Sequence, residues 1–277
     1  MYIRALIENR TDDHQFLVEH GLSIYVEHND LKILVDTGES GTFVKNADKM
    51  GVDLSQIDLF IASHDHYDHT GGLSAFLERN DRAKLYFSEN ANKERVSKHF
   101  FVKEEIGTNK EIFDKYANRI VYINDCTEIS KDVFVVTQFK RQFPTPKGNS
   151  HLYTRDNGKL ILDSFDHEVA IVFKKEEGLT VITGCSHNGI DNMLARVTEC
   201  FPKIHINKLI GGFHLMSFVL PKYLGESKKN IKVIAKRLIE YDIDKVYTCH
   251  CTGERGYKIL KESMGDRLEY MCTGYII

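Results

Sequence analysis

The 277-residue sequence predicts an α/β protein with a single domain over residues 1–277. Segments of strand length, apolar or alternating, occur in both halves of the chain, and amphipathic segments of helix length follow them. A hydrophobic content of 42%, a charged content of 28% and only 4 Pro are typical of a globular protein with a packed core. Because the composition changes nowhere sharply enough to mark a boundary, we expect one domain rather than two.

In the first half, Asn29-Asp30 predicts a hairpin turn between two strands. Helical spacing of apolar residues predicts a helix over 41–50, and Gly71-Gly72 predicts a turn into another. The expected strands of this half are residues 1–6, 22–27, 32–35, 59–62 and 84–88.

Residues 89–118 are polar, and their pattern predicts a helical excursion from the sheet. Its apolar positions are Phe100-Phe101, Phe113 and Tyr116. We expect this segment to form a lid or wall over the functional site.

In the second half, residues 140–166 contain Pro144, Pro146, Gly148 and Gly158, which predict a loop with a short hairpin. Ser227 is placed to cap a helix over 228–241, and further helices are expected over 189–200 and 256–264. The expected strands of this half are residues 121–123, 133–137, 169–173, 180–183, 208–210, 245–248 and 268–277.

Four metal-binding side chains, His64, His66, Asp68 and His69, directly follow the apolar strand over 59–62. Alternate side chains of an extended segment share a face, so the first two can reach one metal ion and the last two a second. Imidazole with carboxylate oxygens suits zinc, and also binds iron, manganese or nickel. A solvated, histidine-rich turn is the alternative, but the position between a buried strand and a Gly-Gly turn favours a metal site.

This HxHxDH spacing resembles the signature of the metallo-β-lactamase superfamily, and residues 34–38, 181–184 and 246–250 are also similar to it. Residues 19–23, 184–190 and 211–215 resemble its dihydropterin-methyl-ribofuranosylaminobenzene-phosphate synthase subgroup. The resemblance implies a four-layer αββα sandwich, the metallo-β-lactamase fold. It also implies a binuclear centre of two divalent metal ions, for which we favour zinc.

Residues far along the chain have to complete two metal positions. His250 follows the strand over 245–248, where the superfamily has its last histidine, so we expect it beside Asp68 and His69. We choose His187 as the third ligand of the metal ion bound by His64 and His66, with His167 as the alternative.

Cys185 stands near the place where the resemblance implies a bridging Asp. It is either a thiolate ligand or a small buried filler.

Three further residues are candidates around the centre. The resemblance implies that Asp36 hydrogen-bonds a ligand imidazole, although a turn-capping role explains it equally well. It also places His20 near the site, with a surface histidine as the alternative, and His214 as a substrate contact or proton donor.

Because alternate residues of a strand face opposite ways, Cys249 and Cys251 are expected to face away from the metal and to be structural.

Charge and cysteine content limit the partners. The net charge of −3 disfavours nucleic acid, and no apolar run reaches the length of a membrane span. The start of the sequence lacks a signal-peptide pattern, and the six cysteines show no disulfide rhythm. We therefore expect a cytoplasmic protein that acts on a small molecule, and we leave its oligomeric state open, with a dimer as one option.

The expected function is hydrolysis, with Asp68 orienting a metal-bridging hydroxide that attacks a phosphate ester, a carboxylic ester or a lactone. The loop over 184–189 suggests a phosphorylated substrate, because backbone N–H groups before a helix can bind an anion. The subgroup's name implies a second possibility, a transferase that forms a C–N bond. A metal-stabilised ligand-binding protein is a third. A diiron oxidoreductase is disfavoured because His66 stands where those proteins have Glu, and because the chain has no room for a flavin domain.

Overall fold

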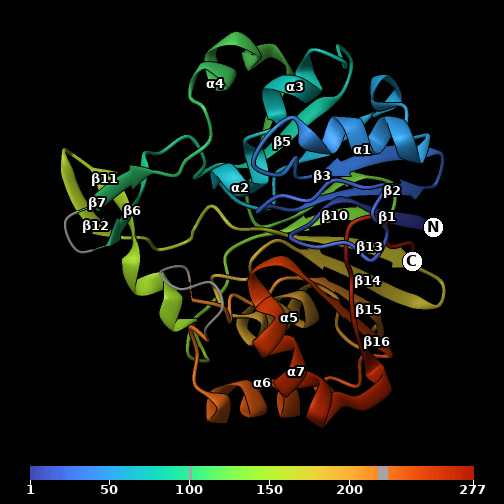
Figure 1. The fold of residues 1–277 in the computed structure, drawn as a ribbon, viewed down its shortest axis with the longest axis vertical. Coiled ribbons are helices and arrows are strands. Elements are labelled where there is room, and N and C mark those ends of the chain that lie inside the picture. The colour runs from blue at the N-terminus through green and yellow to red at the C-terminus, as the bar shows by residue number, and fades with distance from the viewer. Residues whose placement is uncertain (100–101, 218–223) are drawn as a thin grey trace.

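Two β-sheets face each other, and helices cover the outer face of each, so that the computed structural model has four layers in the order αββα (Figure 1). The structure describes residues 1–99, 102–217 and 224–277. The four-layer sandwich predicted from the sequence is confirmed.

The first sheet has the strand order β1-β2-β3-β4-β5-β8. Its first three strands are antiparallel and its last three continue in parallel. The strands are β1 (Tyr2–Ile7), β2 (Ser23–His28), β3 (Leu31–Val35), β4 (Leu59–Ile61), β5 (Lys84–Ser88) and β8 (Ile120–Ile123). Asn29 and Asp30 both have positive φ, as the predicted tight turn between β2 and β3 requires.

The second sheet repeats this layout in the second half of the chain, with the order β17-β16-β15-β14-β13-β10-β9. Here too the early strands are antiparallel and the later ones parallel. The strands are β9 (Cys126–Ser130), β10 (Val133–Val136), β13 (Ala170–Lys175), β14 (Gly178–Thr183), β15 (Ile206–Gly211), β16 (Lys245–Thr248) and β17 (Leu268–Tyr270).

Alternation along the strands builds two kinds of core. In β3 and β4, Leu34 and Phe60 pack against the helices, whereas Val35 and Ile61 pack against the other sheet. The outer helices are α1 (Thr42–Met50), α3 (Leu73–Leu77) and α4 (Glu111–Lys115) on the first sheet, and α5 (Ile190–Cys200), α6 (Lys228–Glu240) and α7 (Gly253–Met264) on the second. Ser227 caps α6 as predicted, because its side chain accepts a hydrogen bond from the Asn230 N–H.

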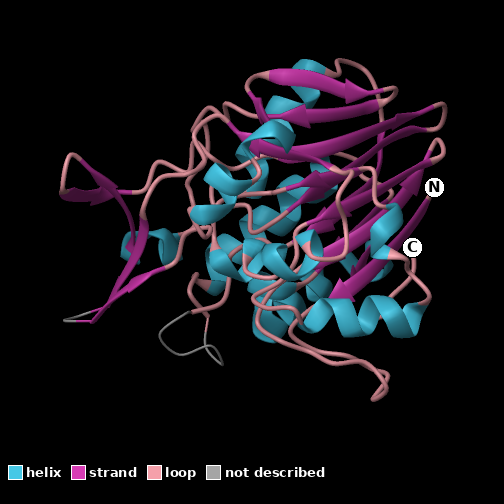
Figure 2. Ribbon diagram, turned by 90° about the horizontal axis from the view of Figure 1, so that it is seen from above, coloured by secondary structure: helices cyan, strands magenta, loops and turns pink. Residues whose placement is uncertain are grey.

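A third sheet of four strands projects from one end of the sandwich (Figures 1 and 2). Its order is β12-β11-β6-β7, formed by β6 (Arg95–His99), β7 (Val102–Glu105), β11 (Leu152–Asp156) and β12 (Lys159–Leu162). The predicted helical character of 89–118 is therefore wrong, because in the described part of this range only the short α4 and a 3-10 turn over Ala117–Arg119 are helical. The pairing of β6 with β11 joins segments far apart in the chain, which a local pattern does not show. Phe100-Phe101 lie outside the described residues.

The strands differ from the prediction in two further places. The last strand ends at Tyr270 rather than 277, because the chain then turns back along β1, where the Ile3 N–H donates to the Ile277 carbonyl at 3.1 Å. Strand β9 was not predicted, since its alternating polar residues give no strong apolar signal.

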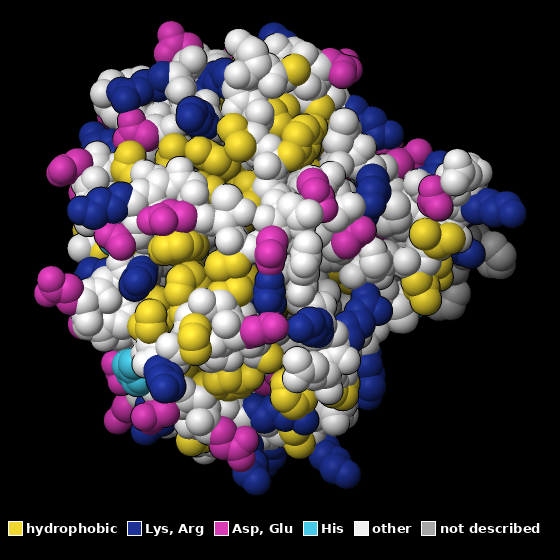
Figure 3. Space-filling view, turned by 180° about the vertical axis from the view of Figure 1, so that it is seen from behind, with side chains coloured by type: hydrophobic (Ala, Val, Ile, Leu, Met, Phe, Trp, Pro, Cys, Tyr) yellow, Lys and Arg dark blue, Asp and Glu magenta, His cyan; other side chains and the backbone are white. Residues whose placement is uncertain are grey.

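The surface mixes charges of both signs: on the face in Figure 3, Lys and Arg side chains are interspersed with Asp and Glu. Among the described residues, every helix is too short or too polar to cross a bilayer. That nucleic acid is not a partner stays a prediction.

A buried arginine joins the projecting sheet to the sandwich. The Arg95 guanidinium donates to the Thr154 hydroxyl at 2.6 Å and to the Asp163 carboxylate at 3.3 Å, and it lies 3.5 Å from Asp65. Asp65 belongs to the HxHxDH loop and also accepts from the Thr108 N–H at 3.2 Å. This ion-pair network fixes the projecting sheet against that loop.

We predict that Arg95→Met lowers the free energy of unfolding by about 3–5 kcal/mol, because it leaves two buried carboxylates without their cation. The matched control is Arg155→Met on the neighbouring strand β11, whose partly exposed ion pair with Glu94 contributes about 1 kcal/mol or less. Urea unfolding of the two variants measures the difference, and equal losses would contradict the role given to Arg95.

Candidate metal centre

The HxHxDH loop begins where β4 ends. His64 and His66 lie in the loop itself, and Asp68 and His69 lie on the one-turn helix α2 (Tyr67–Thr70) that follows. The ring centroid of His64 lies 4.6 Å from that of His66 and 4.1 Å from that of His69. The four side chains predicted from the sequence are thus brought together, and all four are buried.

His187, from the loop between β14 and α5, joins the first two histidines. Its ring centroid is 5.0 Å from that of His64 and 4.8 Å from that of His66. The Nδ1 atoms of His64 and His187 are hydrogen-bonded to Ser63 Oγ and Asn149 Oδ1, at 2.9 and 3.0 Å. The Nε2 atoms of His64, His66 and His187 are buried and have no hydrogen-bond partner among the described residues.

Such orphaned nitrogens fit a bound cation, because a buried polar atom without a partner is costly. Burial and the neighbouring imidazoles lower the pKa of His64 and His187 well below the usual value, and burial lowers the pKa of His66 to about 3. The three rings are therefore neutral, which is the form that donates an electron pair to a metal. This donor set suits a divalent transition metal such as zinc.

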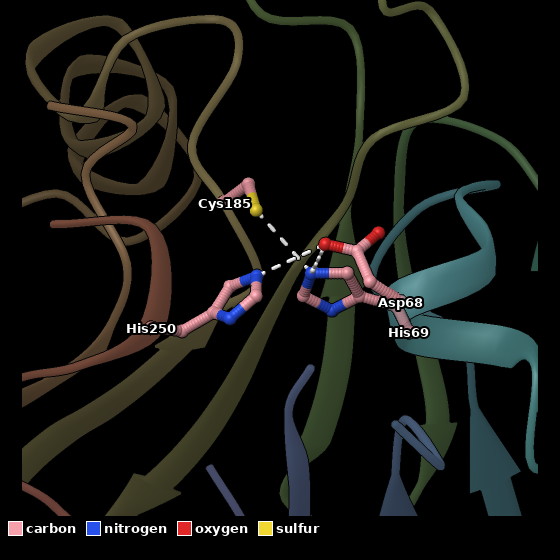
Figure 4. Close-up of side chains that lie close together, drawn as sticks. All are labelled: Asp68, His69, Cys185 and His250. Carbon is pink, nitrogen blue, oxygen red and sulfur yellow. Dashed lines mark hydrogen bonds and ion pairs between the residues drawn. The ribbon is translucent and has the colours of Figure 1, made fainter. Parts of the chain in front are cut away.

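A second group is formed by Asp68, His69, Cys185 and His250, whose donor atoms all lie within 4.8 Å of one another (Figure 4). His250 Nε2 lies 3.1 Å from Asp68 Oδ2, and His69 Nε2 lies 3.2 Å from Cys185 Sγ. His250, expected from its place after β16, is thus found beside the loop. Burial would lower the pKa of His69, but the carboxylates of Asp36 and Asp68 outweigh it and raise the pKa to about 9.

Cys185 lies between the two groups. Its Sγ is within 4.8 Å of the donor nitrogens of His64 and His187 as well as of the second group. Burial raises the pKa of this thiol, so the sulfur needs a cation beside it to lose its proton. Of the two roles expected for Cys185, the geometry therefore favours a ligand shared by both groups over a buried filler.

Asp36 organises the loop from behind. Its Oδ1 accepts from the Ser63 N–H at 2.7 Å, and its Oδ2 lies 2.6 Å from both Ser63 Oγ and His69 Nδ1. With Nδ1 engaged in this way, the Nε2 of His69 is left to face Cys185. Asp36 therefore contacts an imidazole of the centre, as the resemblance implied.

Two buried glutamates that the sequence analysis missed hold the distant loops. Glu8 accepts from the His250 N–H at 2.6 Å, and Glu168 accepts from the N–H groups of His187 and Asn188 at 2.6 and 2.8 Å. Glu8 gave no local signal, since it is 242 residues from His250. Glu168 stands next to His167, which was the one hint available.

The hydrogen bonds to Glu168 also correct an expectation. The backbone N–H groups over 184–189 were expected to be open to an anionic substrate. The N–H of His187 and of Asn188 are instead taken by the Glu168 carboxylate. This loop therefore no longer supports a phosphorylated substrate.

The remaining histidines take different places. His20 Nε2 lies 3.4 Å from Asp68 Oδ2, and the His214 ring centroid lies 4.2 Å from that of His187. His167 Nδ1 accepts from the Asp65 N–H at 2.9 Å, and its Nε2 lies 3.5 Å from Asp163, beside the Arg95 cation. The His167 ring centroid lies 6.1 Å from that of His64, against 5.0 Å for His187, so the geometry favours His187 as the companion of His64.

A cavity of about 730 Å³, counting its open mouth, lies beside the two groups. The centre contributes His20, His66, Asp68, Cys185, His187 and His214 to its lining. The opposite wall comes from the projecting sheet and the turn that precedes β11, with Ser97, His99, Glu104, Ile106, His151 and Leu152. The expected wall over the site is thus present in position, although it is built from strands.

Comparison with known proteins agrees with this architecture. The model of the Metallo-beta-lactamase superfamily matches residues 17–125. The solved structure of Tm1679, described as a metal-dependent hydrolase of the beta-lactamase superfamily, is similar at 30% identity and a TM-score of 0.82, over 100% of this chain and 98% of that one. The 7,8-dihydropterin-6-methyl-4-(beta-D-ribofuranosyl)-aminobenzene-5'-phosphate synthase of Methanocaldococcus jannaschii is 28% identical over 95% of this chain and 90% of its own. Zn²⁺-bound PqqB from Methylobacterium extorquens, at 10% identity, covers 100% of this chain and 99% of its own with a TM-score of 0.62, which shows a shared fold.

We predict that Asp36→Asn weakens the binding of zinc by about 10–100-fold, because an amide cannot accept from Ser63 and His69 as the carboxylate does. Competition with a chromophoric chelator measures the affinity. Asp53→Asn is the control, since Asp53 only caps an exposed 3-10 turn. Equal affinity in the two variants would show that Asp36 does not position the metal-binding rings.

Proposed function

Because the chain belongs to the metallo-β-lactamase superfamily, we propose that it is a metal-dependent hydrolase acting on a phosphate ester, a carboxylic ester or a lactone of a small molecule. The observation that carries this proposal is the pair of donor groups that share Cys185 at the floor of an open cavity. The similarity to Tm1679, described as a metal-dependent hydrolase, supports it.

The residues that would hold two divalent ions are divided between the two groups. His64, His66 and His187 would hold the first, and Asp68, His69 and His250 the second, with Cys185 between them. When bound, two such ions lower the pKa of a shared water and stabilise the charge that develops in hydrolysis.

The protein groups around the donors have separate roles in this proposal. Asp68 has two carboxylate oxygens. One can hold a cation while the other accepts a hydrogen bond from the attacking water and orients it. The His20 and His214 rings line the same cavity on either side of the donors and are placed to contact substrate or to deliver a proton to the leaving group. Asp36, Glu8 and Glu168 act through the rings and loops that they hold.

A second candidate is synthesis in place of hydrolysis. The M. jannaschii relative, similar over nearly the whole length of both chains, is named for a product that joins a dihydropterin to a ribofuranosyl-aminobenzene phosphate. In that case the same centre would activate a transfer that forms a C–N bond, and the cavity would accept two ring systems. The wall of Ile106, Leu152, His99 and His151 offers apolar and imidazole surfaces suited to a flat aromatic body.

We predict that zinc-loaded protein hydrolyses at least one member of a panel of phosphodiesters, phosphomonoesters and lactones. Asp68→Asn should lower kcat on that substrate by about 10²–10⁴-fold, because the carboxylate that orients the water is lost. Asp114→Asn, on the surface helix α4, is the control. Zinc content is measured alongside, so that loss of metal is separated from loss of catalysis.

The panel also separates the two candidate functions. Absence of turnover with every ester and lactone, together with formation of a pterin–aminobenzene adduct detected by mass spectrometry, would replace hydrolysis by synthesis. Absence of both would leave a metal-stabilised binding protein and overturn the proposal.

We predict that the projecting sheet sets substrate choice without affecting the metal. Leu152→Ala in the wall should change the ratio of kcat/KM between two panel substrates by about 10-fold, because it removes apolar contact on one side of the cavity. Zinc content should equal that of the wild type. Lys103→Ala, on the edge strand β7, is the control, and an altered zinc content in Leu152→Ala would count against a wall role.

A further inference from the structure

Cys251 lies on the metal side of the chain, although strand alternation predicted that it faces away. Strand β16 ends at Thr248, and His250–Thr252 form a 3-10 turn in which His250 has φ of +49°. Alternation therefore stops before Cys251. Cys249 enters the apolar layer between the sheets as expected, whereas Cys251 packs against Cys185 and Met216.

Two hydrogen bonds fix the position of the Cys251 sulfur. The backbone N–H of His214 donates to Cys251 Sγ at 3.2 Å. The Cys251 S–H in turn donates to the Cys185 carbonyl at 3.5 Å, so the sulfur is held between the loops that carry His214 and Cys185. Gly212 makes room for it, because a Cβ at that position would collide with Cys251 Sγ.

The donor atoms of Cys185, Cys251 and His214 all lie within 4.8 Å of one another, and all three side chains are buried. Bonds of about 2.3 Å to sulfur and about 2.0–2.1 Å to nitrogen place the ligands of a tetrahedral zinc ion at mutual distances of this order. A purely apolar filler at position 251 would account for the packing against Met216. It would not account for a backbone donor, a second thiol and an imidazole that converge on one point.

We propose that Cys185, Cys251 and His214 form a sulfur-rich position for a soft divalent cation, adjoining the two donor groups already described. Two thiolates and one imidazole favour zinc over the hard cations magnesium and calcium. Cys251 would add a second sulfur ligand to that of Cys185, and Cys185 can serve as a bridge because a thiolate sulfur has more than one lone pair. With a cation bound there, His214 would be a ligand, and His20 would be the imidazole left to contact substrate or to deliver a proton. Binding of the cation needs no substrate, so this inference goes beyond the proposed hydrolysis and is tested apart from it.

The test compares zinc content and cobalt spectra of three proteins kept reduced with a phosphine: wild type, Cys251→Ser and Cys249→Ser. After loading with excess zinc and desalting, wild type should retain about one ion per chain more than Cys251→Ser, since the serine hydroxyl is a poor zinc ligand. Cys249→Ser, a matched change two residues away in the apolar layer, should equal wild type. In cobalt-loaded protein, the sulfur-to-cobalt charge-transfer absorption should be weaker in Cys251→Ser alone.

Equal zinc content and equal charge-transfer absorption in wild type and Cys251→Ser would overturn the proposal. Cadmium-113 NMR of the wild type gives a reading that does not depend on any variant's folding. A resonance at the shift of a two-sulfur site is expected, and its absence overturns the proposal as well. Neither measurement uses turnover, so failure of the hydrolase proposal would leave the result unaffected.

Discussion

The candidate metal centre depends on one buried carboxylate. Asp36 is fully shielded from solvent, has a left-handed backbone conformation with φ of +59°, and is surrounded by the Ser63 N–H, the Ser63 hydroxyl and His69 Nδ1. A carboxylate so placed is stable only while all of these donors remain in position. It therefore fixes the end of β4, the start of the HxHxDH loop and the ring orientation of one histidine at the same time.

The same principle is repeated on the other loops. Glu8 holds the backbone of His250 and also accepts from the Tyr270 hydroxyl at 2.7 Å, and Glu168 holds the loop of His187. Burial raises the pKa of both glutamates, and this effect outweighs the hydrogen bonds, which lower the pKa. In each case a carboxylate from one segment of chain fastens a histidine carried by another, so the donor atoms converge before any ion binds. Such preorganisation strengthens metal binding, since the folded chain has already brought the ligands together.

The projecting sheet gives the sandwich a wall that its two main sheets do not provide. It is attached through Arg95, whose cation lies among the carboxylates of Asp65 and Asp163 directly behind the HxHxDH loop. The wall and the metal-binding loop are thus parts of one ion-pair network. Because the centre supplies the chemistry and the wall supplies much of the cavity surface, differences in substrate within such a fold can arise in the projecting sheet while the donor residues stay the same.

The sequence by itself determined the local cluster of His64, His66, Asp68 and His69, because ligand spacing is a short-range property. The αββα sandwich followed from the resemblance to the superfamily, while strand periodicity alone predicted an α/β protein. The sequence also indicated His187, His250 and Cys185 through their places at strand ends. Only the tertiary structure decided that Glu8 and Glu168 hold these loops, that β6 pairs with β11, and that His167 accepts from the Asp65 N–H. It also decided that Cys251 turns toward Cys185, because β16 ends before that residue and alternation no longer applies. Each of these depends on contacts between segments far apart in the chain, and no local pattern encodes which distant partner a buried polar group will meet.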